Sequence, residues 1–130
     1  MLAVKPGFRN GAAKARFVAL HQIIIERHWL QRRFDLVLIL YSFPKNERLR
    51  LRVEVGEHEP VTTVEGIWPT ANWLEREVYD MFGIVFAGHS YLKRLLLPEE
   101  WQGYPLRKDY DILQQDEAWV RENLGIESGQ

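Results

Sequence analysis

Apolar and polar positions in the first half of the chain follow the patterns of β-strands. Phe34–Phe43 is almost continuously apolar, which is typical of a central strand covered on both faces. Arg48–Val55 alternates strictly, with Leu and Val on one face and mainly Arg on the other, so one face meets the core. Turn residues at 44–47 join the two stretches, and together they predict an antiparallel hairpin. The arginine face is either solvated or a second docking surface, and the pattern leaves both open.

Two further segments have less uniform patterns. Phe17–Ile25 fits a helical stripe, yet its three consecutive isoleucines favour a strand. Thr70–Phe82 shows the helical period, with apolar residues three and four apart. Gly83 follows at the position where a helix commonly ends. Asn72 and Glu75 have the spacing of a capping box, and the threonine that opens the segment is a rival cap.

These segments predict an α+β fold. We expect a small mixed or antiparallel sheet of three to four strands, one or two packed helices and a long irregular C-terminal arm. Short extended pieces are also predicted at 61–68 and 84–86. Residues 1–16 are expected to be loosely ordered, residues 17–88 to form the core domain, and residues 89–130 to form a C-terminal arm and tail.

Composition narrows the class of protein. The 130 residues are 46% hydrophobic and 27% charged, with a formal net charge of −1, which fits one domain and does not favour nucleic acid or an anionic membrane. No cysteine is present, so disulfides, iron–sulfur ligation and a thiol nucleophile on this chain are excluded. The longest apolar runs are far below the roughly 20 residues that cross a bilayer. We therefore expect a cytosolic domain without a membrane span.

Candidate chemistry is sparse. No two histidines are four residues apart and no cysteine or carboxylate cluster supports them, so no metal site is expected; the histidines are His21, His28, His58 and His89. No phosphate-binding or dinucleotide-binding glycine motif is present. Glu75, Glu77 and Asp80 could form an acid–base site, with His89 beside them. A solvated or ion-paired helix face is favoured, with Arg76 spaced to pair with Asp80. We expect no catalytic, cofactor-binding or metal-binding residue.

The segment His89–Asp111 is unusual, because it has little regular period. An irregular stretch of this length inside a compact chain is functional or wraps a partner. Its aromatic and arginine side chains are the types enriched at protein interfaces. The alternative is a loop folded over its own sheet, and the pattern alone favours neither.

Four runs carry a resemblance to a known family: Trp73–Ile84, Phe86–His89, Lys93–Leu96 and Gly103–Tyr110. In fixed order they closely resemble the signature of the thirty-kilodalton (C) subunit of respiratory complex I, the NADH:quinone oxidoreductase. The likeness extends over about Phe17–Asp111. The interface and signature positions are Glu75, Arg76, Glu77, Tyr79, Asp80, Met81, Phe82, Gly83, Gly88, His89, Arg94, Trp101, Gly103, Pro105, Leu106, Arg107, Lys108, Asp109 and Tyr110. The chain departs from the family pattern at Ser90, Tyr104 and Asp111.

The resemblance implies a non-redox structural subunit in the peripheral arm of a proton-translocating complex, on the cytoplasmic side of the membrane. It would brace the forty-nine-kilodalton, hydrogenase-like (D) subunit, which helps form the quinone site, and contact neighbouring peripheral-arm subunits. NADH, flavin, iron–sulfur clusters and quinone would belong to those partners, and this chain would bind no cofactor. The expected bracing residues are Arg76, Arg94, Trp101, Arg107, Lys108 and Tyr110. The resemblance favours the interface interpretation, in which the arm and tail at 89–130 dock on a partner subunit.

A related complex is the open alternative. Similar subunits occur in membrane-bound hydrogenases, in ferredoxin- or deazaflavin-linked complexes and in the photosynthetic NAD(P)H dehydrogenase. The sequence alone does not identify the electron donor or the quinone.

Overall fold

The computed structural model describes residues 19–27, 31–111 and 121–122. The segment 1–16 and the tail after residue 111, apart from those two residues, lie outside this part of the chain. The division into loosely ordered segment, core and docking tail therefore stays a prediction.

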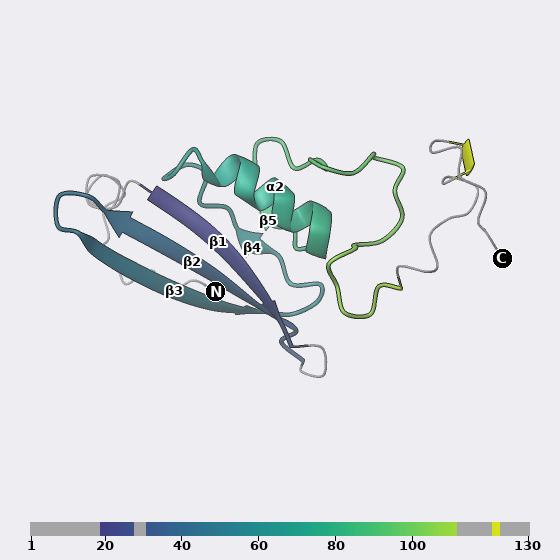
Figure 1. Cartoon of the computed structure of the whole chain (residues 1–130), viewed down its shortest axis with the longest axis horizontal. Coiled ribbons are helices and arrows are strands. Elements are labelled where there is room, and N and C mark those ends of the chain that lie inside the picture. The colour runs from purple at the N-terminus through teal and green to yellow at the C-terminus, as the bar shows by residue number, and fades with distance from the viewer. Residues whose placement is uncertain (1–18, 28–30, 112–120, 123–130) are drawn as a thin grey trace.

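A three-stranded antiparallel sheet forms the larger layer (Figure 1). It contains β1 (Ala19–Glu26), β2 (Phe34–Ser42) and β3 (Glu47–Val55) in the order β1-β2-β3. The hairpin of β2 and β3 is as predicted, and the segment around the three isoleucines is a strand. β2 is central, which explains its continuous apolar run.

The core lies on one face of this sheet. Residues opposite each other in the register share a face, and Leu36 is opposite both Ile24 of β1 and Val53 of β3. Phe34, Leu36 and Leu38 of β2 are at most 2% exposed. Each such side chain contributes about 1.5–3 kcal/mol through burial, so this face provides most of the apolar stabilisation.

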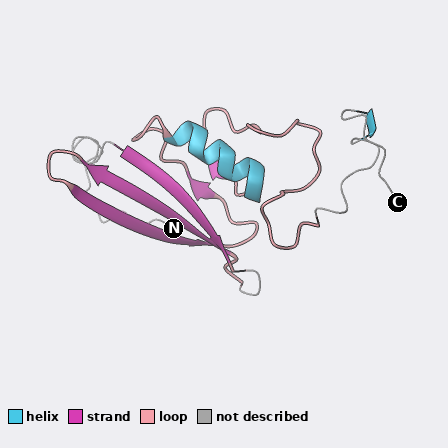
Figure 2. Cartoon of the chain, viewed as in Figure 1, coloured by secondary structure: helices cyan, strands magenta, loops and turns pink. Residues whose placement is uncertain are grey.

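Two short strands and one helix cover that face (Figure 2). β4 (Val61–Thr62) pairs in parallel with β5 (Phe86–Ala87), within the extended pieces that the sequence predicts at 61–68 and near 84–86. Between them runs α2 (Ala71–Phe82). Val78 of the helix and Ile84 after it join the core cluster. The α+β prediction is confirmed.

The helix ends as predicted, and of the two caps predicted for its start one is in place. Gly83 adopts a left-handed φ of 76°, and its N–H donates to the carbonyl oxygen of Tyr79, which is a C-terminal cap. Thr70 occupies the N-cap position without a side-chain cap bond. The capping box is wrong, because the Glu75 carboxylate is turned into the protein and Asn72 donates instead to Ser90.

The polar face of α2 also differs from the prediction. Glu75 and Asp80 are fully buried, whereas Glu77 is exposed. The cause is visible in Figure 1, where α2 lies between the sheet layer and the chain that follows β5. A helix covered on two sides needs partners for polar residues on its second buried side. The predicted pairing of Arg76 with Asp80 is also wrong, because Asp80 pairs with Arg94.

Candidate docking arm and its buried carboxylates

Residues 89–111, here called the arm, follow α2 along one side and pass around its C-terminal end (Figure 1). Asp80 organises the first part of the arm. Its Oδ2 atom accepts hydrogen bonds from the N–H groups of Leu95 (3.0 Å), Leu96 (2.7 Å) and Leu97 (3.0 Å). Its Oδ1 atom accepts one from Arg94 Nη1 at 2.7 Å. Burial opposes the charged carboxylate, but the bonds from Arg94 and the three amides outweigh it and lower the pKa of Asp80.

The Arg94 guanidinium extends this contact to a later part of the arm. Its Nη2 atom donates to the carbonyl oxygens of Trp101 (3.1 Å) and Gly103 (3.0 Å). Nη1 also donates to the Asp80 carbonyl oxygen at 3.1 Å, and the group lies 5.3 Å from the Tyr104 ring centroid. One buried carboxylate and one arginine thus join the helix to two separate stretches of arm backbone.

Arg107 fixes the arm where it passes the end of α2. Its Nε atom donates to the Phe82 carbonyl oxygen at 2.6 Å, and its guanidinium lies 5.4 Å from the ring of Phe34 and 4.7 Å from that of Tyr104. The close approach requires glycine at position 83, because a Cβ there would lie 2.5 Å from Tyr104 Cε2. The left-handed turn that ends the helix therefore also seats the arm.

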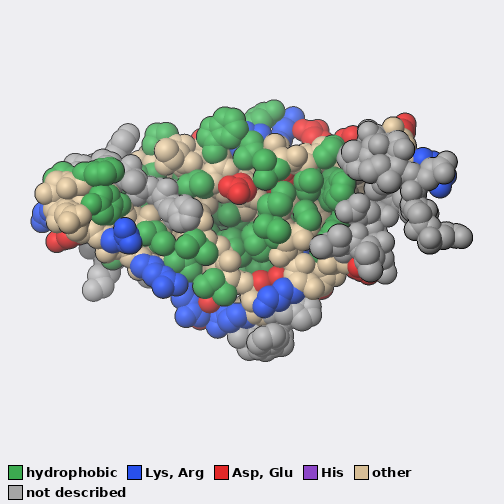
Figure 3. Space-filling model, viewed as in Figure 1, with side chains coloured by type: hydrophobic (Ala, Val, Ile, Leu, Met, Phe, Trp, Pro, Cys, Tyr) green, Lys and Arg blue, Asp and Glu red, His purple; other side chains and the backbone are tan. Residues whose placement is uncertain are grey.

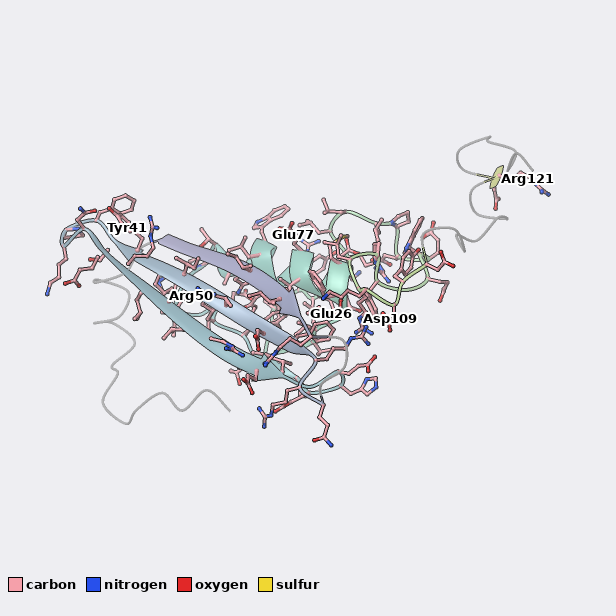
Figure 4. All side chains as sticks on the ribbon, turned by 60° about the horizontal axis from the view of Figure 1, so that its bottom comes forward. Glu26, Tyr41, Arg50, Glu77, Asp109 and Arg121 are labelled. Atoms are coloured by element: carbon pink, nitrogen blue, oxygen red, sulfur yellow. The ribbon has the colours of Figure 1, made fainter. Side chains whose placement is uncertain are left out.

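A second charged cluster, here the Arg33 cluster, holds the end of the arm. The Arg33 side chain is 7% exposed; its Nη2 lies 2.7 Å from Glu26 Oε1 and 2.6 Å from Asp109 Oδ1. Its Nη1 donates to Glu57. Lys108 donates its backbone N–H to Glu26 Oε2 at 2.7 Å. Figure 4 shows Glu26 and Asp109 close together at the junction of sheet and arm. The hydrogen bond from Arg33 lowers the pKa of Asp109.

Glu75 occupies the other end of α2. Its Oε1 atom accepts from the Val64 N–H at 2.9 Å, and its Oε2 accepts from the Thr63 hydroxyl. Burial is the largest influence and raises the pKa of Glu75. The two buried carboxylates of one helix are therefore shifted in opposite directions.

His89 lies beside Glu75 and connects the helix to the start of the arm. Its Nδ1 accepts the Tyr91 N–H at 3.0 Å, which places the ring proton on Nε2. Nε2 lies 3.0 Å from the Asn72 carbonyl oxygen, 3.7 Å from Glu65 and 3.9 Å from Glu75. Because both nitrogens are engaged by backbone, the ring serves as a bridge between α2 and the arm.

The three departures from the family pattern take definite places. Ser90 donates its N–H and its hydroxyl to Glu65, and these bonds lower the pKa of that carboxyl. Tyr104 packs edge-to-face on Tyr79, with centroids 6.5 Å apart. Asp111 is exposed. Ser90 and Tyr104 thus make contacts that fix the arm on this chain.

The outward side of α2 and the arm carries exposed aromatic side chains. Trp73 is 61% and Tyr91 54% exposed. The Arg76 guanidinium lies between them, 5.3 Å and 5.2 Å from the two ring centroids. Arg76 is held there by hydrogen bonds to the carbonyl oxygens of Lys93 and Arg94. The aromatic pair is therefore fixed before any partner binds.

Two leucines of the arm are also exposed, and a groove lies beside Trp73. Leu96 is 64% and Leu106 57% exposed. In Figure 3, hydrophobic side chains stand over the α2 region of the visible face. Beside Trp73 lies an open groove of about 590 Å³, lined by Thr63, Glu65, Gly66, Pro69, Asn72, Trp73 and Gly88. We call Trp73, Tyr91, Leu96 and Leu106 the outer face.

The signature residues are thus sorted by the fold. Buried ones are Glu75, Asp80 and Met81; half-buried ones are Arg76, Tyr79, Phe82, Gly83, His89, Arg94, Trp101, Pro105, Arg107 and Tyr110; exposed ones are Glu77, Gly88, Gly103, Leu106, Lys108 and Asp109. The polar groups of Arg76, Arg94, Arg107 and Lys108 bond to the chain's own backbone. Their contact with a partner stays a prediction. The alternative interpretation, a loop folded over its own domain, also describes the arm, since the arm packs on α2 and the sheet.

Some important residues are missing from the sequence-based set: Glu26, Arg33, Glu65, Trp73 and Tyr91. The helical period could have predicted that Trp73 is exposed, because this residue lies off the apolar stripe of α2. The Arg33 cluster joins positions far apart in the chain, so no local pattern could indicate it. Of the four residues considered for catalysis, Glu75 lies beside His89, Asp80 is paired with Arg94 in a separate cluster, and Glu77 is exposed.

Two further findings concern the described ranges as a whole. No three His, Asp or Glu side chains within them are grouped as metal ligands. No helix in the same ranges has the length and apolar character needed to cross a bilayer.

Comparisons with known proteins identify a family. A family model described as the respiratory-chain NADH dehydrogenase 30 kDa subunit matches residues 8–116. The C subunit of NADH-quinone oxidoreductase from Roseiflexus sp. (strain RS-1) is 49% identical over 89 residues, covering 68% of this chain and 51% of that protein. Its counterpart from Geotalea uraniireducens is 49% identical over 81 residues, or 62% of this chain and 49% of that one.

A third relative has a longer chain. The C/D subunit of NADH-quinone oxidoreductase from Acidiphilium cryptum is 46% identical over 117 residues, covering 83% of this chain and 20% of that protein. This chain spans about half the length, or less, of the curated relatives it matches.

Proposed function

This chain belongs to the 30 kDa subunit family of the respiratory-chain NADH dehydrogenase, and we propose that it acts in the complex as a structural subunit. Electron transfer from NADH to quinone, and the proton translocation coupled to it, would be activities of the whole assembly. NADH, flavin, iron–sulfur clusters and quinone would be held by other subunits. The chain would sit in the peripheral arm on the cytoplasmic side of the membrane.

The observation that carries the structural role is the outer face. Large exposed apolar side chains grouped on one surface mark interaction sites, and Trp, Tyr and Arg are the residue types that dominate binding energy. Arg76 lies between the exposed rings of Trp73 and Tyr91. Because its own bonds to the arm fix this geometry, little side-chain entropy would be lost on binding. A preorganised surface suits a bracing role.

The proposed partner is the hydrogenase-like D subunit. The name of the Acidiphilium relative joins the C and D subunits in one protein, which supports a close relation between the two. The related hydrogenase-type complexes are less well supported, since the relatives described above are all named for NADH and quinone. The outer face would cover part of the D surface, and the arm would hold that face at a fixed position on the sheet.

The test is co-expression of the full chain with the D subunit from the same genome, followed by purification through a tag on D. We expect Trp73→Ser combined with Tyr91→Ser to reduce recovery of this chain by about tenfold or more, since aromatic hot spots contribute on the order of 2 kcal/mol each. Leu96→Ser with Leu106→Ser should give a smaller loss. Circular dichroism of the free variants checks that they fold.

A matched control lies in the turn between β2 and β3. Phe43 there is 66% exposed, so Phe43→Ser removes an exposed ring that belongs neither to α2 nor to the arm. It should leave recovery unchanged. Recovery that is the same for the Trp73/Tyr91 variant as for Phe43→Ser would contradict the proposal.

A further inference from the structure

The outer edge of β3 is open. Within the described residues β3 pairs only with β2, so every second residue presents an unpaired N–H and C=O on the other side. Among the described residues, the chain returns beside β3 at its C-terminal end, where Val53–Val55 and Glu59–Thr62 line a pocket of about 50 Å³. The stretch Glu47–Arg52 remains accessible, and all its residues except Leu51 are exposed.

One face of this edge is basic. Arg48, Arg50 and Arg52 point to the same side, and Figure 3 shows Lys and Arg side chains along the rim that β3 forms in Figure 1. Arg52 is paired with Asp35 and Glu54. Arg48 lies over the Tyr41 ring at 6.0 Å with no carboxylate partner in the described chain. Arg50, labelled on the sheet in Figure 4, makes no ion pair there either.

The opposite face of the same edge is apolar and continuous with the core. Leu51 packs against the buried pair Leu40 and Trp68. Leu49, two residues before Leu51 on the same face of β3, is 36% exposed. An apolar side chain placed next to Leu49 and Leu51 would extend this cluster and remove its exposed rim from water. The edge therefore offers backbone pairing, an apolar side and a basic side together.

We propose that Glu47–Arg52 accepts an extended segment of a partner protein as a fourth strand, and that this segment alternates acidic and apolar residues. Its acidic residues would lie opposite Arg48 and Arg50, and its apolar residues opposite Leu49 and Leu51. This surface is separate from the outer face and does not depend on the proposed function.

A second copy of this chain does not suit the edge. In a symmetric dimer, two β3 strands would pair antiparallel with matching faces. Depending on the register, Arg50 of one copy would then lie opposite Arg50 or Arg52 of the other. Like charges directly opposite each other destabilise a sheet. The same arginines that attract an acidic strand therefore disfavour self-association, which is one way in which proteins protect edge strands.

The test uses the full chain and a capped synthetic peptide that alternates Glu and Val. NMR titration and amide hydrogen exchange should show binding confined to Glu47–Arg52, with slower exchange of the outward N–H groups. A peptide with Lys in place of Glu should bind about tenfold more weakly, equivalent to about 1.4 kcal/mol. The double variant Arg48→Glu and Arg50→Glu should reverse this preference. A peptide with a central Pro, which lacks a donor, should not bind.

Several results would overturn the proposal. They are equal binding of the Glu and Lys peptides, binding that survives the Pro substitution, and no binding of the Glu peptide at about 1 mM. Sedimentation of the free chain provides one more test. A dimer that dissociates in the charge-reversed variant would assign the edge to a second copy and overturn the proposal.

Discussion

The sheet and the arm are stabilised by different kinds of interaction. The sheet is held by apolar side chains in register, such as Leu36 between Ile24 and Val53, and many similar contacts contribute. The arm is organised by a few charged groups: Asp80 alone accepts three backbone amides and one guanidinium group. Stability in the sheet is therefore distributed, whereas in the arm it is concentrated in single residues that have no substitute.

Replacement of Asp80 tests this contrast with the largest expected effect. Asp80→Asn removes the charge that pairs with Arg94. It also places the N–H₂ group of the amide next to backbone N–H groups and a guanidinium, which are themselves hydrogen-bond donors. Breaking a buried ion pair costs about 3–5 kcal/mol, and we expect the arm to open while the sheet stays folded. Limited trypsin digestion should cleave after Arg94 and Arg107 much faster than in the wild type. Glu77→Gln, an exposed position on the same helix, is the control and should change nothing.

Replacement in the sheet should behave differently. Leu36 is 1% exposed, and Leu36→Ala should lower the free energy of unfolding by about 3 kcal/mol through lost burial and a cavity. Because the arm is seated on this core, sheet and arm should unfold together in urea, as seen by circular dichroism and tryptophan fluorescence. Leu49→Ala, at the exposed edge, should cost less than about 1 kcal/mol. Separate transitions in the Leu36 variant would show that the arm does not depend on the sheet.

The two buried carboxylates of α2 should respond to pH with opposite sign. Asp80, with its lowered pKa, stabilises the fold above its ordinary value of 3.8, and this contribution is lost as pH falls through the lower folded pKa. Glu75, with its raised pKa, stabilises the fold below its ordinary value of 4.5, and this contribution is lost as pH rises through the higher folded pKa.

Glu75→Gln isolates the second effect. The neutral amide can keep contacts to Val64 and Thr63 without burying a charge, so we expect a gain within about 1 kcal/mol at pH 8 and none at pH 4. Urea unfolding at the two pH values measures this difference. An equal change at both pH values would contradict the assignment of burial as the main cause.

A similarly small effect is expected at Gln22. This β1 residue is 9% exposed and lies opposite Leu38, and neither of its amide atoms has a hydrogen-bond partner in the structure. Gln22→Met keeps the side-chain length and removes the unsatisfied polar group. We expect a gain of about 1 kcal/mol in the free energy of unfolding. A loss of stability would mean that ordered water satisfies the amide.

The same contrast explains how much the sequence could reveal. Periods of two and 3.6 report burial on one side of an element, so the hairpin, the central position of β2, α2 and its end at Gly83 were predictable. They do not report partners that arrive from distant segments. For that reason the burial of Glu75 and Asp80, the pairing of Asp80 with Arg94 and the Arg33 cluster could not be derived. The resemblance marked the signature positions without distinguishing inward from outward side chains.

The inward contacts also determine which experiments on the arm are informative. Deleting residues 89–111 would remove Arg94 and the three amide donors from Asp80, and would remove Asp109 and Lys108 from the Arg33 cluster. Such a variant is expected to be unstable for reasons unrelated to assembly. Substitutions on the outer face avoid this problem, because those side chains are more than half exposed.

The central claim is that the arm belongs to the folded domain and holds its outer face in place before a partner binds. Amide hydrogen exchange of the isolated full chain, read at Leu95, Leu96 and Leu97, tests it most directly. We predict that the three N–H groups bonded to Asp80 exchange about a hundredfold or more slowly than in an unfolded chain, and that Asp80→Asn removes this protection. Exchange at the unfolded rate in the wild type would contradict the claim and show that only a partner orders the arm.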